Sequence, residues 1–305
     1  MKTINLGKTG LKIPAVALGC MRITELDRSE VPSYLYHTLE LGIDFFDHAD
    51  IYGGGECERI FAEGLSKLDI PRESIILQSK CGIVPGKMYD LSYKYIIDSV
   101  DGILRRLNTE YLDILLLHRP DALVEPEEVA KAFDDLHKNG KVRYFGVSNH
   151  RPLQIELLKK YVSQEICIDQ MQLSLPFSSM ISEGLEANMQ TEGAVDRSGS
   201  ILDYCRVNDM TMQVWSPFQG KNGTFIDDND TYPDLNWRLG ELAAKYDTNK
   251  TAVAAAWLLR QPSGVQLIAG TMNKQRLSDI ASAADIRLTR EEWYSLYLSA
   301  GHILP

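Results

Sequence analysis

The sequence predicts an α/β fold in which eight parallel strands and the helices between them close into a (β/α)8 TIM barrel. Two observations indicate this fold. Short apolar strand candidates alternate with amphipathic helical patterns along the chain, and the candidates are apolar almost throughout, as parallel strands buried on both faces are. With 305 residues, the chain can hold the roughly 250 residues of such a barrel together with insertions.

An open doubly wound sheet is the alternative arrangement of alternating strands and helices. The first strand of such a sheet is normally followed by a GxGxxG turn that binds a dinucleotide. Here the corresponding turn is Gly19-Cys20-Met21-Arg22, which is not that fingerprint. The sequence therefore favours the barrel.

The predicted elements begin with an N-terminal β-hairpin, in which residues 3–6 and 11–14 flank a turn with a glycine at each end. The eight strand candidates that follow are residues 15–19, 45–48, 74–80, 112–118, 144–148, 166–171, 212–215 and 266–269.

Helical patterns separate these strands. Val129, Ala132, Phe133 and Leu136 recur with the spacing of one buried helical face, and residues 91–107 and 252–259 show similar patterns. Pro126 suits the first turn of the helix that contains this face. Thr289-Arg290-Glu291-Glu292 is a capping box that predicts a last short helix.

Two connections are longer than usual, residues 172–198 and 218–234. Both are polar, and long loops at the carboxyl-terminal face of a barrel are commonly functional. We therefore expect both at that face, and we expect residues 172–198 to form part of the pocket wall together with the loops around Arg22, residues 53–56 and Met88. No repeat or linker suggests a second domain, so residues 1–305 are expected to form one domain.

Composition excludes several functions. The net charge of −10 argues against a general surface for nucleic acid or anionic membrane. No apolar stretch approaches the ~20 residues that span a bilayer, and the N-terminus lacks the apolar segment of a signal peptide. Five scattered cysteines without a CxxC pair predict neither a disulfide framework nor a structural zinc site, and a cytoplasmic location fits them.

Four polar residues stand at or just after the ends of successive strand candidates: Asp47, Tyr52, Lys80 and His118. The carboxyl ends of barrel strands form the active-site face, so these four side chains are expected to meet there. A tyrosine donates its proton poorly at neutral pH, and a nearby ammonium lowers its pKa. We expect Lys80 to act on Tyr52 in this way and Asp47 to hold Lys80.

His118 would donate a hydrogen bond to a substrate oxygen. A general acid beside a group that stabilises an oxyanion is what reduction of a carbonyl requires. Each residue alone has an ordinary structural explanation, such as a strand terminus, a turn or a core histidine. Their recurrence at one level of successive strands favours the catalytic interpretation.

Several short motifs carry a family resemblance. They are Asp47–Gly53 with Lys80 and residues 116–121, and further along the chain Gly146-Val147-Ser148-Asn149, Gln170, Trp215-Ser216-Pro217 and Gly270-Thr271 with Arg276. In this order and spacing they resemble the aldo-keto reductase family over essentially the whole chain, most closely its bacterial NADP-dependent oxidoreductases.

The resemblance implies a (β/α)8 barrel that reduces an aldehyde or ketone with NADPH and uses no metal. It implies that Tyr52 donates the proton, that Lys80 and Asp47 adjust the pKa of Tyr52, and that His118 positions the carbonyl. The residues that it assigns to the cofactor are Ser148, Asn149, Gln170, Trp215, Ser216, Pro217, Phe218, Gln219, Gly270, Thr271, Met272, Arg276 and Asp279.

Two positions depart from the family pattern. Many relatives carry lysine where this chain has Gly270, which removes one phosphate-binding charge, and Ile280 stands where some relatives have an asparagine at the adenine. NADPH is the expected cofactor, with NADH use left open. The substrate is expected to be a small carbonyl compound, without an obligate protein partner.

Two other functions remain as hypotheses. The first is an NADPH-sensing regulatory subunit of the same fold with little turnover, as in potassium-channel β subunits. The second is a metal-dependent hydrolase that uses Asp47, His48, Asp50 and His118, although no HxH or HExxH pattern is present.

Overall fold

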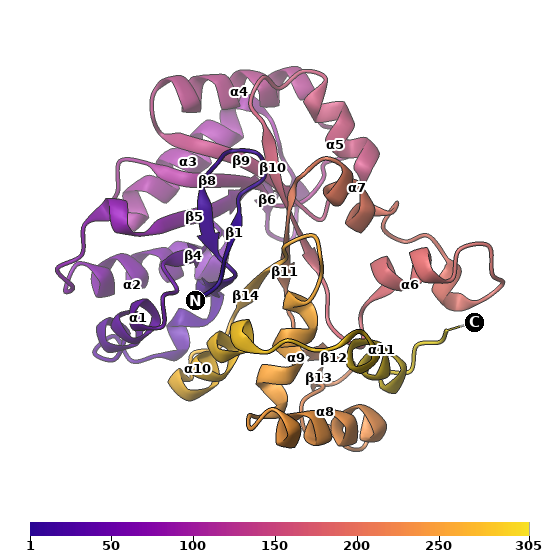
Figure 1. Cartoon of the computed structure of the whole chain (residues 1–305). Helices are drawn as coiled ribbons and strands as arrows, with labels where there is room; N and C mark the ends of the chain where they lie inside the picture. Colours follow the sequence, from indigo (N-terminus) through magenta and orange to yellow (C-terminus); the bar gives the residue numbers. More distant parts are fainter. Residues whose placement is uncertain (305) are drawn as a thin grey trace.

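The strand candidates form a closed barrel of eight parallel strands, which confirms the predicted fold class (Figure 1). The structure, a computed structural model, describes residues 1–304. In barrel order the strands are β3 (Val16–Gly19), β4 (Phe45–Asp47), β5 (Ile76–Cys81), β8 (Leu112–Leu117), β9 (Val142–Ser148), β10 (Ile166–Gln172), β11 (Thr211–Trp215) and β14 (Gln266–Ala269). Pairing of β14 with β3 closes the barrel.

Helices cover the outside of the barrel (Figure 1). Between consecutive strands from β3 to β10 lie α1 (Val31–Glu40), α2 (Glu56–Leu65), α3 (Tyr93–Leu107), α4 (Pro126–Lys138) and α5 (Pro152–Lys159). The later helices are α6 (Ser179–Leu185), α7 (Ile201–Val207), α8 (Pro233–Lys245), α9 (Lys250–Leu259), α10 (Lys274–Ser282) and α11 (Arg290–Ser299). The predicted helical segments thus lie in α3, α4, α9 and α11.

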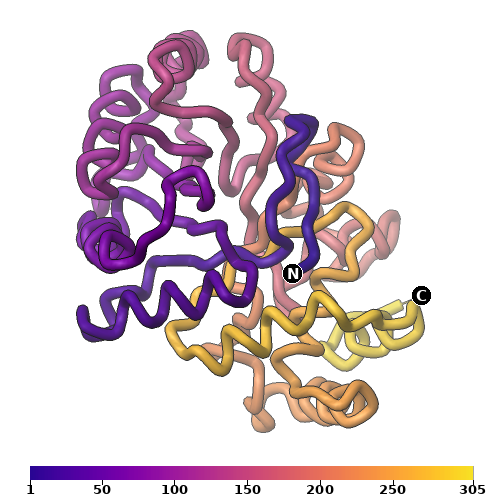
Figure 2. The backbone as a smooth tube through the Cα atoms, turned by 60° about the vertical axis from the view of Figure 1, so that its left-hand side comes forward, coloured from indigo at the N-terminus to yellow at the C-terminus, as the bar shows by residue number. Residues whose placement is uncertain are grey.

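The predicted N-terminal hairpin is present as β1 (Thr3–Asn5) and β2 (Lys12–Pro14). It covers the amino end of the barrel, where the Gly7 backbone N–H donates to Thr211 Oγ1 over 2.8 Å at the start of β11. A Cβ at Gly7 would lie 2.8 Å from Cys167 Cβ, so only glycine allows this close approach. Figure 2 shows the hairpin in indigo beside the strands.

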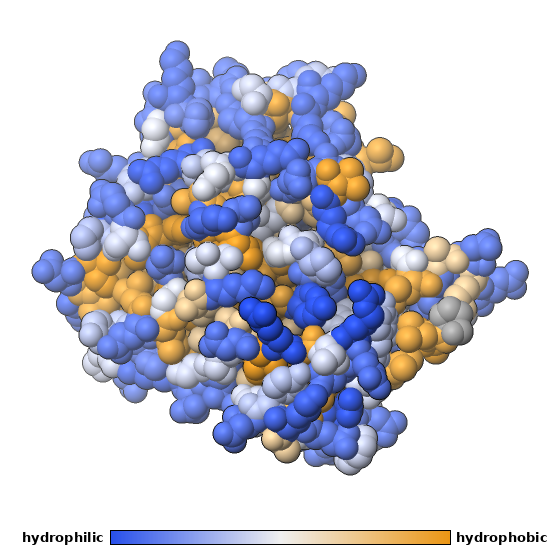
Figure 3. All heavy atoms as spheres, viewed as in Figure 1, coloured by the Kyte–Doolittle hydropathy of each residue, from blue (hydrophilic) through white to orange (hydrophobic). Residues whose placement is uncertain are grey.

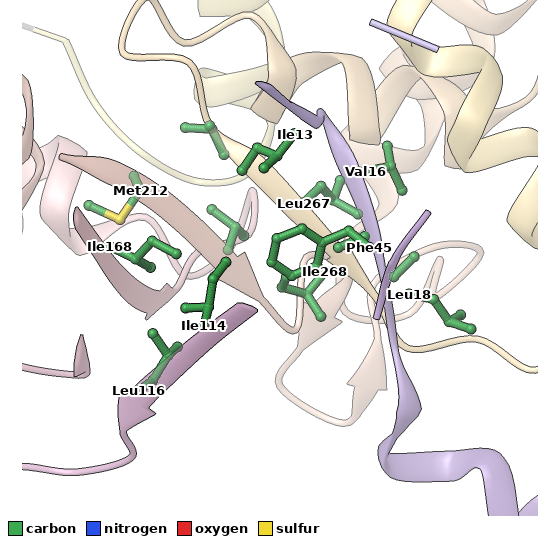
Figure 4. Close-up of a cluster of buried hydrophobic side chains, with 14 of the residues drawn as sticks. Ile13, Val16, Leu18, Phe45, Ile114, Leu116, Ile168, Met212, Leu267 and Ile268 are labelled. Atoms are coloured by element: carbon green, nitrogen blue, oxygen red, sulfur yellow. The ribbon is translucent and has the colours of Figure 1, made fainter. Parts of the chain in front are cut away.

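Buried hydrophobic side chains pack inside the barrel beside buried polar ones, and they fill the layer between strands and helices. Figure 4 shows part of it, with Phe45 among aliphatic side chains from several strands. All six residues of β8 are buried, which agrees with the nearly continuous apolar pattern that predicted parallel strands. Hydrophilic residues cover most of the face drawn in Figure 3, with hydrophobic ones interspersed.

The connection 172–198 is more ordered than its sequence predicts. It contains α6 and a 3-10 turn, η4 (Glu192–Ala194). The buried Glu183 carboxylate accepts hydrogen bonds from the backbone N–H groups of Arg197 at 3.0 Å, Ser198 at 3.2 Å and Ser200 at 3.1 Å. The other long connection, 218–234, contains a small hairpin of β12 (Gln219–Gly220) and β13 (Gly223–Thr224).

Within residues 1–304, no helix combines the length and the apolar character that crossing a membrane requires.

Candidate active site

The chain brings Asp47, Tyr52 and Lys80 together through two neighbouring strands and a glycine turn. Asp47 ends β4, and Lys80 lies near the end of β5. After Tyr52 the three glycines at 53–55 all have positive φ, between 56° and 88°. Glycine adopts this conformation at no steric cost, and the turn leads directly into α2, which fixes the backbone next to Tyr52.

Lys80 is fully buried, and hydrogen bonds surround its ammonium. Nζ lies 2.7 Å and 2.8 Å from the two Asp47 carboxylate oxygens and donates to the His48 carbonyl at 2.8 Å. It also lies 3.3 Å from Tyr52 Oη. Burial lowers the pKa of Lys80, but Asp47 and Tyr52 raise it more, so the side chain stays charged. A buried charge requires such a partner.

Tyr52 differs from the expectation that Lys80 lowers its pKa. Burial raises the pKa of Tyr52, and the Lys80 ammonium offsets this only in part, so the pKa lies above its ordinary value. Desolvation outweighs the nearby charge because the phenol is largely removed from solvent. Tyr52 therefore holds its proton at neutral pH and can donate it.

His118 faces Tyr52 across the cavity, with ring centroids 6.0 Å apart and nearly perpendicular planes. Burial, followed by the charges of Lys80 and Arg119, lowers the pKa of His118 to about 3. The ring is thus neutral at physiological pH. Its Nδ1 is buried without a hydrogen-bond partner in residues 1–304. Because buried N–H groups are almost never left unpaired, the proton belongs on Nε2.

A cavity of about 650 Å³ opens over these residues. The predicted site residues on its wall are Asp47, Tyr52, His118, Ser148, Asn149, Gln170, Trp215, Ser216, Pro217, Phe218, Gln219, Gly270, Thr271 and Arg276. Met272 lines an adjoining cavity of about 490 Å³. Lys80 lies behind Tyr52, with its side chain fully buried. Asp279 lines neither cavity; its carboxylate accepts from Gln275 at 3.0 Å.

Hydrogen bonds join the side chains that the sequence assigns to the nicotinamide end. Trp215 Nε1 donates to Asn149 Oδ1 at 3.1 Å, Asn149 Nδ2 donates to Ser148 Oγ at 2.8 Å, and Ser148 Oγ donates to the Gln170 carbonyl at 2.9 Å. Asn149 and Ser216 both have positive φ, at 59° and 50°. Backbone strain of this kind is common at functional sites, although six other non-glycine residues among residues 1–304 also have positive φ.

The second cavity holds the residues assigned to the phosphate. α10 begins beside it, with the Asn273 side chain accepting from the Arg276 N–H at 2.9 Å. Arg22 Nη1 donates to the Gly270 carbonyl at 3.0 Å and lines both cavities. A cation from another loop thus lies beside Gly270, the position for which the family resemblance implied a missing phosphate-binding charge.

Sequence reasoning missed part of the cavity wall. Arg22 lines the main cavity, as expected for a pocket wall, and it also lines the adjoining cavity beside the phosphate segment. Residues 53–56 and 172–198 do not line either cavity. The loop around Met88 does so through Ile83, which pairs with Tyr89, whereas Ile51 and Arg119 line it without having been expected. Arg119 follows His118 directly, which is the one local signal that could have identified it.

The metal hypothesis needs a cluster of ligands. Residues 1–304 contain no group of three or more histidine, cysteine or acidic side chains placed to hold a metal ion. His48 instead packs edge-on against Phe61, with ring centroids 4.6 Å apart.

Comparison with known proteins identifies the family. The model of the aldo/keto reductase family matches residues 15–297, so the chain belongs to this family, as the motifs predict. The chain is similar to the uncharacterized oxidoreductase YcsN of Bacillus subtilis, with 32% identity over 321 residues and 100% of both chains covered. It is 33% identical to a 6-dehydroglucose reductase of Agrobacterium fabrum over 303 residues, with 95% of each covered.

A solved structure supports the same fold. The crystal structure of an aldo/keto reductase from Klebsiella pneumoniae matches with a TM-score of 0.77 at 23% identity, over 97% of this chain and 94% of that one. Together, the family and its oxidoreductase members indicate carbonyl reduction as the general chemistry.

Proposed function

We propose that the chain, acting as one domain of residues 1–305, reduces an aldehyde or ketone to an alcohol with NADPH. The observation that carries the proposal is the buried Lys80 ammonium, which lies 3.3 Å from Tyr52 Oη and is paired with Asp47. Tyr52 and Asp47 line a cavity beside a neutral His118, and Lys80 lies behind Tyr52.

The roles follow from the charge states of these residues. A bound NADPH supplies hydride from its nicotinamide C4 to the carbonyl carbon. His118 Nε2–H donates a hydrogen bond to the carbonyl oxygen and orients it. The Tyr52 hydroxyl gives its proton to that oxygen as negative charge develops there, and the Lys80 ammonium stabilises the phenolate that remains.

The cavity offers groups suited to NADPH. Ser148, Asn149 and Gln170 present polar atoms, and Trp215 offers an aromatic face for the nicotinamide ring. Arg22 and Arg276 line the adjoining cavity and could form charge-assisted hydrogen bonds with the 2′-phosphate. The Klebsiella pneumoniae neighbour was crystallised in complex with NADP and acetate.

For the substrate, the relatives give a starting panel. Two of them, from Agrobacterium fabrum and Novosphingobium aromaticivorans, are 6-dehydroglucose reductases. We propose a small carbonyl compound and would test sugar-derived aldehydes beside simple aromatic ones. Arg119 lines the cavity next to His118 and has several N–H donors for hydroxyl or anionic groups.

Cofactor binding is measured by the quenching of tryptophan fluorescence as NADPH or NADH is added. We expect saturable quenching through Trp215, and a Trp215→Phe variant should lose most of it.

Arg22→Met and Arg276→Met should each weaken NADPH binding by roughly tenfold, because each removes a charged hydrogen bond, and should leave NADH binding nearly unchanged. Equal loss for both cofactors would contradict a 2′-phosphate role for these arginines.

Turnover separates the proposed enzyme from the regulatory subunit. Oxidation of NADPH in the presence of a carbonyl panel is expected for the enzyme. Tight NADPH binding without turnover on any member of a broad panel would favour the sensing subunit instead.

A further inference from the structure

Three buried glutamines stand side by side inside the barrel. Gln170 on β10 is the register partner of Gln213 on β11, and Gln213 is the register partner of Gln266 on β14. Gln213 and Gln266 are fully buried and Gln170 is 3% exposed. In a parallel sheet, register partners project to the same face, so the three amides form one row.

A second row faces the first across the barrel. Asp47 on β4 and Gln78 on β5 are also register partners. Gln78 Nε2 donates to Asp47 Oδ1 at 2.6 Å and to Gln213 Oε1 at 2.9 Å. Gln170 Nε2 donates to the same two oxygens, Asp47 Oδ1 at 3.1 Å and Gln213 Oε1 at 2.9 Å. The two rows are therefore one hydrogen-bonded network that includes Asp47.

Both ends of the network are groups that only accept hydrogen bonds. At the amino end of the barrel, Gln266 Nε2 donates to the Pro14 carbonyl at 2.7 Å. The Gln266 oxygen must then accept, and it does so from Gln213 Nε2 at 2.7 Å. Gln213 Nε2 also donates to Gln78 Oε1 at 3.0 Å. The acceptor at the other end of the network is the Asp47 carboxylate.

These fixed ends determine the orientation of every amide. Flipping Gln266 would place its oxygen against the Pro14 carbonyl, and flipping Gln170 would place its oxygen against the Asp47 carboxylate. In the observed orientation Gln78, Gln170 and Gln213 each use both amide hydrogens. A buried network satisfied in this way is rigid, whereas a half-satisfied one is costly.

One amide oxygen remains without a partner within residues 1–304. It is Gln170 Oε1, and Gln170 lines the main cavity. We propose that Gln78, Gln213 and Gln266 are positioning residues, which hold the Gln170 amide with its oxygen toward the cavity so that it accepts a hydrogen bond from the carboxamide NH2 of the nicotinamide.

This inference rests on the proposed use of NADPH, because it assigns a partner to a group of that cofactor. It extends the cofactor site to residues on β5, β11 and β14 that need not touch the cofactor. Gln213 is the junction of the network, and Gln266 contacts the site only through Gln213.

The test uses two reduced cofactors that differ at one group. NADPH carries the carboxamide, and its 3-acetylpyridine analogue carries a methyl ketone without an N–H donor. We expect the wild-type chain to bind NADPH more tightly than the analogue by roughly five- to tenfold, the contribution of one well-placed hydrogen bond. In Gln213→Met this ratio should fall to within about twofold, and Gln266→Met should lower it less.

Gln172→Met is the matched control, because Gln172 lies on the same strand as Gln170 but outside the network and the cavity wall. Its ratio should equal that of the wild type. Thermal unfolding identifies a variant that does not fold; if Gln213→Met is one, Gln266→Met decides the question.

The outcomes are distinguishable. An unchanged ratio in folded variants, with or without lower stability, would make the network merely structural and overturn the inference. Absence of NADPH binding to the wild type would instead refute the proposed function itself.

Discussion

Burial shifts the pKa values of Tyr52 and His118 in opposite directions. Desolvation disfavours the charged form of each group, so it raises the pKa of Tyr52 above its ordinary value and lowers the pKa of His118 to about 3. Both side chains are neutral at physiological pH. The charges beside them are those of the paired Lys80 and Asp47 and, next to His118, that of Arg119.

The pH dependence of turnover follows from these directions. His118 gains a proton only near pH 3 and Tyr52 keeps its proton beyond neutrality. We expect kcat/KM for NADPH-dependent reduction to stay nearly constant between about pH 5 and about pH 9. An initial-rate profile checks this expectation. A step centred near the ordinary histidine pKa of about 6.5 would contradict it for His118.

Asp169 is a buried carboxyl that the proposed mechanism does not use. It lies on β10 next to Gln170, and its side chain is fully buried. Burial raises its pKa from 3.8 to about 8. Between these two values the unfolded chain releases a proton that the folded chain retains, so the group reduces stability progressively as pH rises.

We therefore expect Asp169→Asn to stabilise the fold at high pH. The gain in unfolding free energy should be on the order of 5 kcal/mol at pH 8 and should fall below about 1 kcal/mol at pH 4, because the amide cannot ionise and has the same shape. Urea denaturation at the two pH values measures it. An equal effect at both would show that ionisation of Asp169 is not the cause.

Among the elements, α11 is one whose start could be predicted from sequence. Thr289 Oγ1 accepts from the Glu292 N–H at 3.1 Å, and Glu292 Oε2 accepts from the Thr289 N–H at 2.8 Å. The helix is then held by two tryptophans: Trp293 Nε1 donates to the Trp257 carbonyl at 3.0 Å, and Trp257 Nε1 donates to the Trp293 carbonyl at 3.1 Å.

Removing the cap should weaken this helix. Thr289→Ala is expected to lower the free energy of unfolding by about 1 kcal/mol, the usual contribution of an N-cap side chain, with little effect on cofactor affinity. Thr289→Ser, which keeps the acceptor, is the control. A loss in Thr289→Ser as large as that in Thr289→Ala would assign the effect to packing of the methyl group.

The connection 172–198 shows why some elements could not be predicted. α6 has only seven residues, too few for a clear helical period. Its surroundings are fixed by Glu183, whose buried carboxylate accepts from residues 197–200, a contact that no local pattern indicates. The expectation that this connection lines the pocket was wrong because long loops at a barrel rim need not face the cavity.

At the scale of the whole molecule, barrel closure makes the site predictable in outline. The order of strands places Asp47, Lys80 and His118 on neighbouring strand ends, so their meeting follows from the sequence pattern once the barrel is assumed. Side-chain environments do not follow from it. The raised pKa of Tyr52 and the approach of Arg22 to Gly270 depend on burial and on loop conformation.

The glutamine network belongs to this scale as well. It reaches from Pro14, in the N-terminal hairpin, to Asp47 at the opposite end of the barrel. Individual glutamines in strand candidates give no sign of such a network, because it requires the register of β10, β11 and β14 and the closure that brings β5 opposite them.

Tyr52 is the proposed proton donor of the reductase reaction. Comparing wild type with Tyr52→Phe tests this role most directly, with NADPH oxidation and NADPH binding measured on the same preparations. We expect turnover to fall by roughly a hundred- to ten-thousandfold, the usual contribution of a general acid, while fluorescence titration gives a nearly unchanged dissociation constant. Equal turnover by Tyr52→Phe and wild type would contradict the account.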